Sequence, residues 1–143
     1  MKNKAYELIE HTADIGIRVK GSDLKELFRN AAAAMFDIIA QKEPHLAQRT
    51  SHIDKIIVKQ KAEGLEELFV NCLNELLSLS ATKERIFSDF TFRKLDGHNL
   101  EAVAMGEDIK NYKVNTEIKA ATYHQLKLEQ IKSGWQAEVI LDV

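Results

Sequence analysis

The chain has 143 residues, the usual length of one domain, and 45% of them are hydrophobic while 29% are charged. This composition is typical of a globular protein and excludes collagen-like, low-complexity and disordered classes. Twenty Lys and Arg against 22 Asp and Glu give a formal net charge of -2, which disfavours a protein that grips nucleic-acid backbones by itself. We therefore expect a single domain over residues 1–143 and no strong direct nucleic-acid binding.

The cysteine count and the N-terminal pattern bear on the compartment. Cys72 is the one cysteine of the chain, so an internal disulfide and a thiolate metal site are excluded, which fits a reducing environment. Residues 1–10 contain no uninterrupted apolar stretch, so we expect neither a signal peptide nor a membrane span there. These features favour a cytoplasmic protein that does not engage a membrane.

The first part of the chain predicts two strands followed by a helix. Alternating apolar residues over 5–19 indicate a strand pair that ends near Lys20. Apolar residues then recur at spacings of three and four over 24–39, and Ser22 is available as the N-cap. The helix must end before Pro44, because proline lacks the N–H that the helical ladder needs. We expect a polar loop to follow.

The next segment repeats the order of strand and helix. Residues 53–58 are rich in β-branched side chains, which predicts a strand, and apolar residues at helical spacing over 65–77 predict a second amphipathic helix. Residues 24–31 also resemble residues 65–72, since each segment begins Leu-x-x-Leu-Phe. Either a strand–helix unit has been duplicated, or two helices that pack on one sheet share the same apolar spacing.

The second half of the chain has the patterns of strands. Residues 87–95 and 99–105 flank the turn residues 96–98, where glycine supplies the required dihedral angles. Residues 116–128 read as an extended segment, and alternation over 135–143 predicts a last strand. The chain is thus predicted to be an α+β domain, with a largely antiparallel or mixed β-sheet covered by two amphipathic helices.

Candidate functional residues begin where the first two strands would reverse. His11, Thr12 and Asp14 place an imidazole, a hydroxyl and a carboxylate within four residues. Hard cations take carboxylate and carbonyl oxygens, and one short loop supplies part of such a shell. The alternative is turn chemistry, in which Thr and Asp side chains bond to neighbouring backbone N–H groups.

The end of the chain offers further oxygens. Asp142 falls on the strand face opposite Trp135 and Leu141, where it is either a solvated charge or a ligand. Val143 can add a backbone or terminal oxygen to the same cation. If the fold brings Asp14 to this point, the set suits Ca²⁺ or Mg²⁺ better than Zn²⁺, which favours nitrogen and sulfur ligands.

Residues 117–124, Glu-Ile-Lys-Ala-Ala-Thr-Tyr-His, combine charges, an aromatic ring and an imidazole. Strand alternation would place Glu117, Lys119 and Tyr123 on one face, from which Lys119 could meet an acidic partner or a phosphate. The alternative is that Glu117 and Lys119 are cross-strand surface charges. Cys72 lies on the apolar face of the second helix, which favours a buried structural thiol over a nucleophile.

Three segments together resemble the archease family: residues 6–16, residues 73–77, and residues 117–124 with Asp142 and Val143. The resemblance implies a protein cofactor rather than an enzyme, one that promotes guanylylation and multiple turnover of the RtcB-type RNA ligase. That ligase joins RNA ends bearing a 2′,3′-cyclic phosphate or 3′-phosphate to a 5′-hydroxyl in tRNA splicing and RNA repair, using GTP and a metal.

The same resemblance implies a site. Asp14, Asp142 and the carbonyl of Val143 would bind a divalent cation, Ca²⁺ first and Mg²⁺ or Mn²⁺ as alternatives, with Lys119 near the pocket and His11 in an orienting role. No catalytic residue is implied. Two other classes stay open at this point: a chaperone-like protein-interaction module, and a small metal-dependent phosphohydrolase that uses the cation to activate water.

Overall fold

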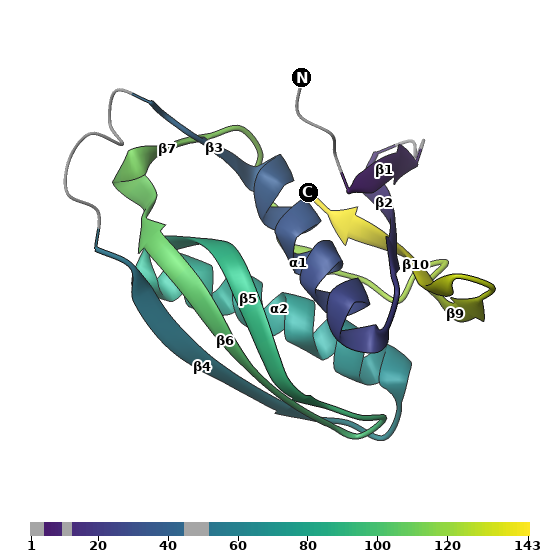
Figure 1. Ribbon diagram of the computed structural model, residues 1–143. Coiled ribbons are helices and arrows are strands. Elements are labelled where there is room, and N and C mark those ends of the chain that lie inside the picture. The colour runs from purple at the N-terminus through teal and green to yellow at the C-terminus, as the bar shows by residue number, and fades with distance from the viewer. Residues whose placement is uncertain (1–4, 10–12, 45–51) are drawn as a thin grey trace.

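A computed structural model describes residues 5–9, 13–44 and 52–143 (Figure 1). The elements in chain order are β1 (Tyr6–Ile9), β2 (Ile15–Gly21), α1 (Leu24–Ile39), β3 (Ala40–Lys42), β4 (Asp54–Lys61), α2 (Leu65–Lys83), β5 (Arg85–Leu95), β6 (Asn99–Asp108), the short 3-10 helix η1 (Ile109–Asn111), β7 (Tyr112–Val114), β8 (Ala120–Ala121), β9 (Lys127–Ile131) and β10 (Gly134–Asp142). Every strand pair among the described residues is antiparallel. The predicted α+β class with two helices is confirmed.

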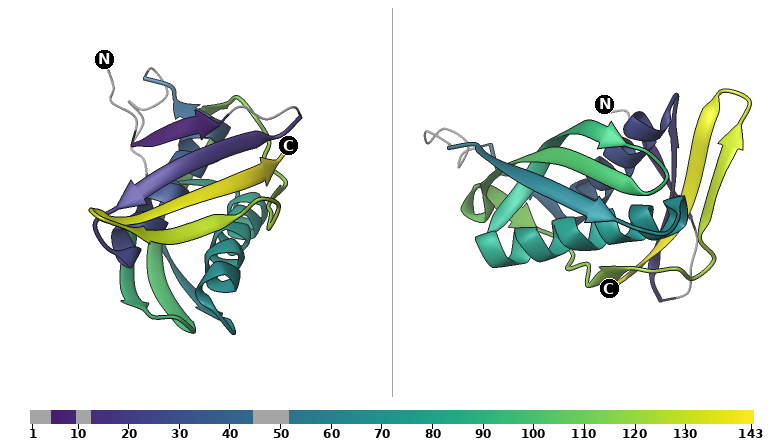
Figure 2. Two further views of the ribbon diagram at one scale, coloured as in Figure 1. Left: turned by 90° about the vertical axis from the view of Figure 1, so that its right-hand side faces the viewer. Right: turned by 90° about the horizontal axis from the view of Figure 1, so that it is seen from below.

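Two larger sheets share the two helices. One has the strand order β1-β2-β10-β8, with β9 also paired to β10, and the other has the order β4-β6-β5. Helix α1 contacts both β2 and β5, so it lies between the two sheets, whereas α2 packs on β4 and β5 and reaches β8 (Figures 1 and 2). A small third sheet pairs β3 with β7. This arrangement makes α1 the common centre of the molecule.

Three phenylalanine rings join the two helices and β5 in one part of the interior. Phe28 on α1 meets Phe69 on α2 edge to face, with ring centroids 5.1 Å apart, and meets Phe92 on β5 at 6.0 Å. Phe28 and Phe69 are 1% and 0% exposed. They are also equivalent positions of the two similar helix sequences, so the repeated pattern brings its own members into contact. Aromatic pairs of this geometry add to the stabilisation from burial.

The start of α1 differs from the sequence prediction. The N-cap is Asp23 rather than Ser22: its side chain accepts a 2.8 Å hydrogen bond from the N–H of Glu26, and the first helical bond joins Leu27 N–H to the Asp23 carbonyl. Ser22 lies one residue too early to cap, and its own N–H donates to the Glu26 carboxylate at 3.0 Å. The two bonds together satisfy backbone donors at the helix start.

The segment predicted as extended over 116–128 is interrupted. Ile118 and Ala121 are both buried, and residues an odd number of positions apart cannot share a face of one strand. The chain therefore forms only the short β8, turns through Gln125, which has a positive φ of 52°, and resumes as β9. The pairing of β3 with β7 was also not predicted, because strands of three residues carry too few positions for a pattern.

Candidate functional site

Asp14 and Asp142 come together through the register of β2 and β10. Ile15, the first residue of β2, is paired with Leu141, so Asp14 directly precedes the strand next to the end of β10 that carries Asp142. Asp142 alternates with the buried Leu141 on β10, so its side chain belongs to the face of the sheet turned away from α1. Asp14 directly precedes β2, so the two acidic residues lie near the same end of the β2–β10 pair.

The third strand at this end carries Lys119. Asp142 is paired with Ala120, and the N–H of Lys119 donates a 2.8 Å hydrogen bond to the carbonyl of Asp142. The side chains of Lys119 and Asp142 are exposed, and Val143 is 37% exposed. The structure therefore brings Asp14, Asp142, Val143 and Lys119 to one place. His11 lies outside the described residues.

Strand β8 is fixed beside β10 from both sides. On the helix side, the Asn74 side chain accepts a 2.7 Å bond from the N–H of Ala121 and donates a 3.1 Å bond to its carbonyl. On the strand side, the N–H and hydroxyl of Thr122 both donate to the carbonyl of Ile140, at 3.1 and 2.8 Å. Sequence reasoning missed Asn74 as a positioning residue, although an amide among the apolar residues of α2 was the available signal.

The neighbouring part of the same sheet face is balanced in charge. Arg18 on β2 lies 3.2 Å from Glu7 on β1 and 2.5 Å from Glu138 on β10, and Lys127 on β9 lies 3.7 Å from the other oxygen of Glu138. Acidic and basic side chains alternate across four strands, an arrangement that stabilises cross-strand neighbours. The alternation of charges stops at the end of β2 and β10, because two carboxylates, those of Asp14 and Asp142, lie near each other there.

That like-charged pair has a chemical consequence. Like charges that come close together on neighbouring strands destabilise a sheet. A divalent cation would offset the repulsion between Asp14 and Asp142. The donors are carboxylate and main-chain oxygens, which fit a hard cation such as Ca²⁺ or Mg²⁺. The described residues contain no cluster of three His, Cys, Asp or Glu side chains suited to a metal, so main-chain oxygens and water would have to complete the shell.

Two other sequence predictions can be placed. Cys72 is 1% exposed within α2, which confirms its predicted burial, and this burial raises the pKa of its thiol to about 12. In the described part of the chain, no helix has the length and apolar character needed to cross a membrane.

Comparison with known proteins gives the family. Residues 6–143 match the model of the Archease protein family (MTH1598/TM1083). The chain is 38% identical to the protein archease of Methanosarcina acetivorans, covering 99% of this chain and 98% of that one, and 36% identical to the protein archease of Pyrococcus abyssi, covering 98% and 99%.

Solved structures agree with this match. The solution structure of protein 1598 of Methanobacterium thermoautotrophicum superposes with a TM-score of 0.73 at 29% identity, covering 99% of this chain and 100% of that one. The crystal structure of a Thermotoga maritima protein, described as an archease and possible chaperone, gives 0.64 at 25% identity and 94% coverage of both chains. From its first described strand to its last, this chain belongs to the archease family.

Proposed function

We propose that this protein activates an RtcB-type RNA-splicing ligase, promoting the ligase's guanylylation and its multiple turnover in tRNA splicing and RNA repair, and that it is not itself an enzyme. The observation that supports the proposal is the pairing of β2 with β10, which brings Asp14 and Asp142 to the same end of the sheet in a chain of this family. The proposal places the protein in the cytoplasm, where such a ligase would work.

The proposed site would hold a divalent cation, Ca²⁺ first and Mg²⁺ or Mn²⁺ as alternatives. Its ligands would be the carboxylates of Asp14 and Asp142 and a main-chain oxygen of Val143. When bound, the cation supplies positive charge between two carboxylates that otherwise repel each other. Asn74 acts as a positioning residue, because it fixes β8 and therefore the main chain of Lys119 beside Asp142. His11 is assigned an orienting role.

Activation would work by population shift. The protein must bind the ligase conformation that reacts with GTP more tightly than it binds the others, since a ligand with equal affinity for all states shifts none of them. The exposed end of the sheet suits this contact: Asp142 and Lys119 offer charges of both signs, while Tyr123, 55% exposed, and Val143 offer apolar surface. Aromatic side chains at such positions commonly anchor protein interfaces.

A second candidate function is that of a general chaperone. The observation that favours it is the description of the Thermotoga maritima relative as a possible chaperone. A general chaperone would suppress aggregation of unrelated unfolded proteins and would not depend on one ligase. Assaying light scattering of a heat-denatured enzyme with and without this protein separates the two functions.

The main test is single-turnover guanylylation of the cognate ligase with labelled GTP. Wild-type protein should accelerate the reaction, and Asp14→Asn and Asp142→Asn should each lose most of the acceleration. Glu129→Gln is the matched control, because Glu129 is an exposed acid on β9 of the same sheet. Circular dichroism establishes that the variants are folded. No acceleration by wild-type protein, or equal loss in the control, would overturn the proposal.

A further inference from the structure

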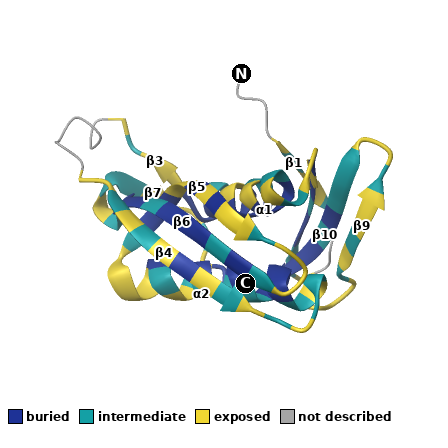
Figure 3. Ribbon diagram, turned by 60° about the horizontal axis from the view of Figure 1, so that its bottom comes forward, coloured by how far each residue is buried: buried dark blue, intermediate teal, exposed yellow. Residues whose placement is uncertain are grey.

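The outer face of the β4-β6-β5 sheet is rich in exposed lysines. Figure 3 shows exposed positions alternating with less exposed ones along β4. Lys55, Lys59 and Lys61 are exposed residues of β4 that share one face with the exposed Ile57, and β5 carries the exposed Lys94. Because alternate residues of a strand share one face, the three β4 lysines project from the same side of the sheet. The face lies on a different sheet from Asp14 and Asp142.

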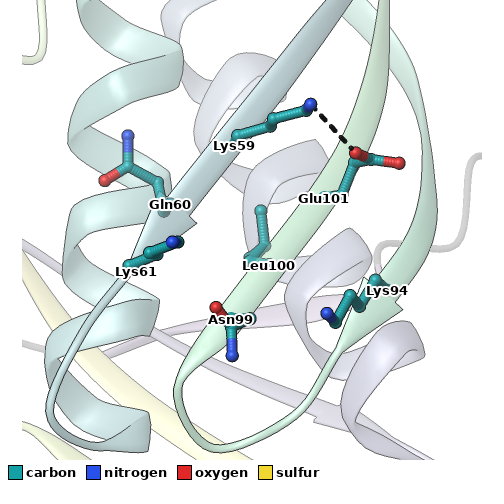
Figure 4. Close-up of a pocket in the computed structure, with 7 residues that line it drawn as sticks. All are labelled: Lys59, Gln60, Lys61, Lys94, Asn99, Leu100 and Glu101. Carbon is teal, nitrogen blue, oxygen red and sulfur yellow. Dashed lines mark ion pairs between the residues drawn. The ribbon is translucent and has the colours of Figure 1, made fainter.

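A groove of about 370 Å³ lies over the hairpin end of this face (Figure 4). Its lining includes Lys59 and Lys61 from β4, Asn99 and Glu101 from β6, and Lys94 from β5. Figure 4 shows the ammonium groups of Lys61 and Lys94 directed toward one another across β6. The groove is therefore formed by β4, β6 and β5, and the pairing of these strands fixes the relative positions of its lining residues.

The charges of the groove do not cancel. Glu101 is the register partner of both Lys59 and Lys94, and its carboxylate lies 3.4 Å from the Lys59 ammonium. Lys61 has no hydrogen bond or ion pair to the side chains that the structure describes. The lining thus has three ammonium groups and one carboxylate, and the carboxylate of Asp96, just outside the lining, partly offsets the charge of Lys94, so Lys61 is the least compensated of the three lysines.

The lining indicates which anion fits. Lysine ammonium groups bind phosphate as point charges, and lysines on two different strands can contact more than one phosphate of a continuous backbone. None of the lining residues is aromatic, so bases would not be stacked. Leu100, the apolar residue of the lining, is 2% exposed, so its side chain is not available to anchor an acidic peptide.

We infer that this groove binds the phosphodiester backbone of an RNA strand, without reading its sequence. Lys61 and Lys94 make the main phosphate contacts, Lys59 is partly neutralised by Glu101, and the amide of Asn99 lies between them. The expectation that the groove binds a phosphodiester backbone does not depend on the proposed function. Only the choice of RNA as the nucleic acid rests on it. This inference departs from the expectation drawn from net charge, which averages over the whole surface.

The test is fluorescence anisotropy of a labelled single-stranded RNA oligonucleotide with the isolated protein, over a range of salt concentrations. We compare wild type with the double variant Lys61→Gln and Lys94→Gln. The control is Lys110→Gln with Lys113→Gln, which removes the same charge from exposed positions in η1 and β7. Losing two phosphate contacts should weaken binding roughly tenfold at low salt and reduce the slope of log affinity against log salt by about 1.4.

A third variant changes affinity in the opposite direction. Glu101→Gln removes the one carboxylate of the groove and should tighten RNA binding while leaving the fold intact, because an exposed ion pair adds little stability. Absence of binding by wild type, or equal weakening in the control pair, would overturn the inference. So would tighter, groove-dependent binding of poly-glutamate, which would indicate an acidic protein partner. The assay contains no ligase, so its failure leaves the proposed activation to its own test.

Discussion

Two exposed regions of the molecule, the end of the first sheet with Asp14 and Asp142 and the lysine-lined groove of the second sheet, place their charges in different ways. At the end of the β1-β2-β10-β8 sheet, the pairing of β2 with β10 brings Asp14 near Asp142, so two like charges lie close together. On the β4-β6-β5 sheet, the register sets Glu101 between Lys59 and Lys94, so the excess of one sign is moderated. The formal net charge of -2 is a sum over the whole chain, so it indicates neither of these regions. Strand register, rather than composition, decides where charge gathers on this surface.

A shared core holds the two regions in fixed relative positions. Helix α1 contacts β2 and β5 on either side, and Phe28 contacts both Phe69 and Phe92. The acidic end and the lysine groove therefore belong to one cooperatively packed structure. The following predictions test whether the two regions are structurally joined yet chemically separate.

The largest effect should come from the shared core. Phe28→Ala removes a ring that is 1% exposed and should lower the free energy of unfolding by about 3–5 kcal/mol, because it leaves a cavity between both helices and β5. Trp135, the one tryptophan, lies on β10 and reports on the first sheet by fluorescence during urea unfolding. Amide exchange of β4 and β6 reports on the second. Loss of stability in one sheet alone would contradict a common core.

The next effect concerns the acidic end. Ca²⁺ at about a hundred times its Kd should raise the free energy of unfolding of the wild type by about 2.7 kcal/mol. The double variant Asp14→Asn with Asp142→Asn should lose this calcium response, whereas Glu129→Gln should keep it. Thermal unfolding with and without Ca²⁺ measures the difference. An unchanged response in the double variant would place the cation elsewhere.

A smaller effect is expected at the residue that positions β8. Asn74→Ala removes two half-buried hydrogen bonds to Ala121 and should lower the free energy of unfolding by about 1–2 kcal/mol. It should also weaken the calcium response, since β8 is no longer fixed beside Asp142. Asn71→Ala, on the same helix, is the control, with an expected change below about 0.5 kcal/mol. Equal losses in both variants would remove the positioning role.

The smallest effect is a dependence on acid pH at the other end of the lysine-bearing sheet. Arg85 donates a 2.5 Å hydrogen bond to Asp54, which lowers the pKa of that carboxyl from its ordinary 3.8. Because the pKa of this carboxyl is lower in the folded state than in the unfolded state, its ionised form stabilises the fold at pH values above the unfolded-state pKa. This stabilisation is lost as the pH falls through the folded-state pKa. Asp54→Asn should therefore flatten the stability profile below about pH 4, whereas the exposed-acid control Glu63→Gln should not.

The sequence patterns were sufficient for the helices and for the burial of Cys72. Apolar spacing over 24–39 and 65–77 predicted both helices, since a helix that packs on a sheet buries one stripe of side chains. The cap at Asp23 was missed, because Ser22 and Asp23 are both suitable capping residues and only the first helical hydrogen bond distinguishes them. Local patterns therefore predicted whether a segment is a helix or a strand. They did not predict the residue at which each element begins or ends.

The functional regions depended on information that no local pattern contains. Asp14 and Asp142 are far apart in the chain and meet only through the pairing of β2 with β10. Lys61 and Lys94 likewise come from strands on either side of β6. The role of Asn74 depends on its two hydrogen bonds to Ala121, a residue far away in the chain. Non-local register is therefore the part of the structure that sequence reasoning could not supply.

We propose that the end of the sheet with Asp14 and Asp142 and the lysine groove are separate sites with separate roles. The most direct measurement assays two variants, Asp14→Asn with Asp142→Asn and Lys61→Gln with Lys94→Gln, for both ligase guanylylation and RNA binding. We predict that the first loses acceleration of guanylylation and keeps RNA binding, and that the second does the reverse. Loss of both activities in either variant, with its fold intact, would contradict the account.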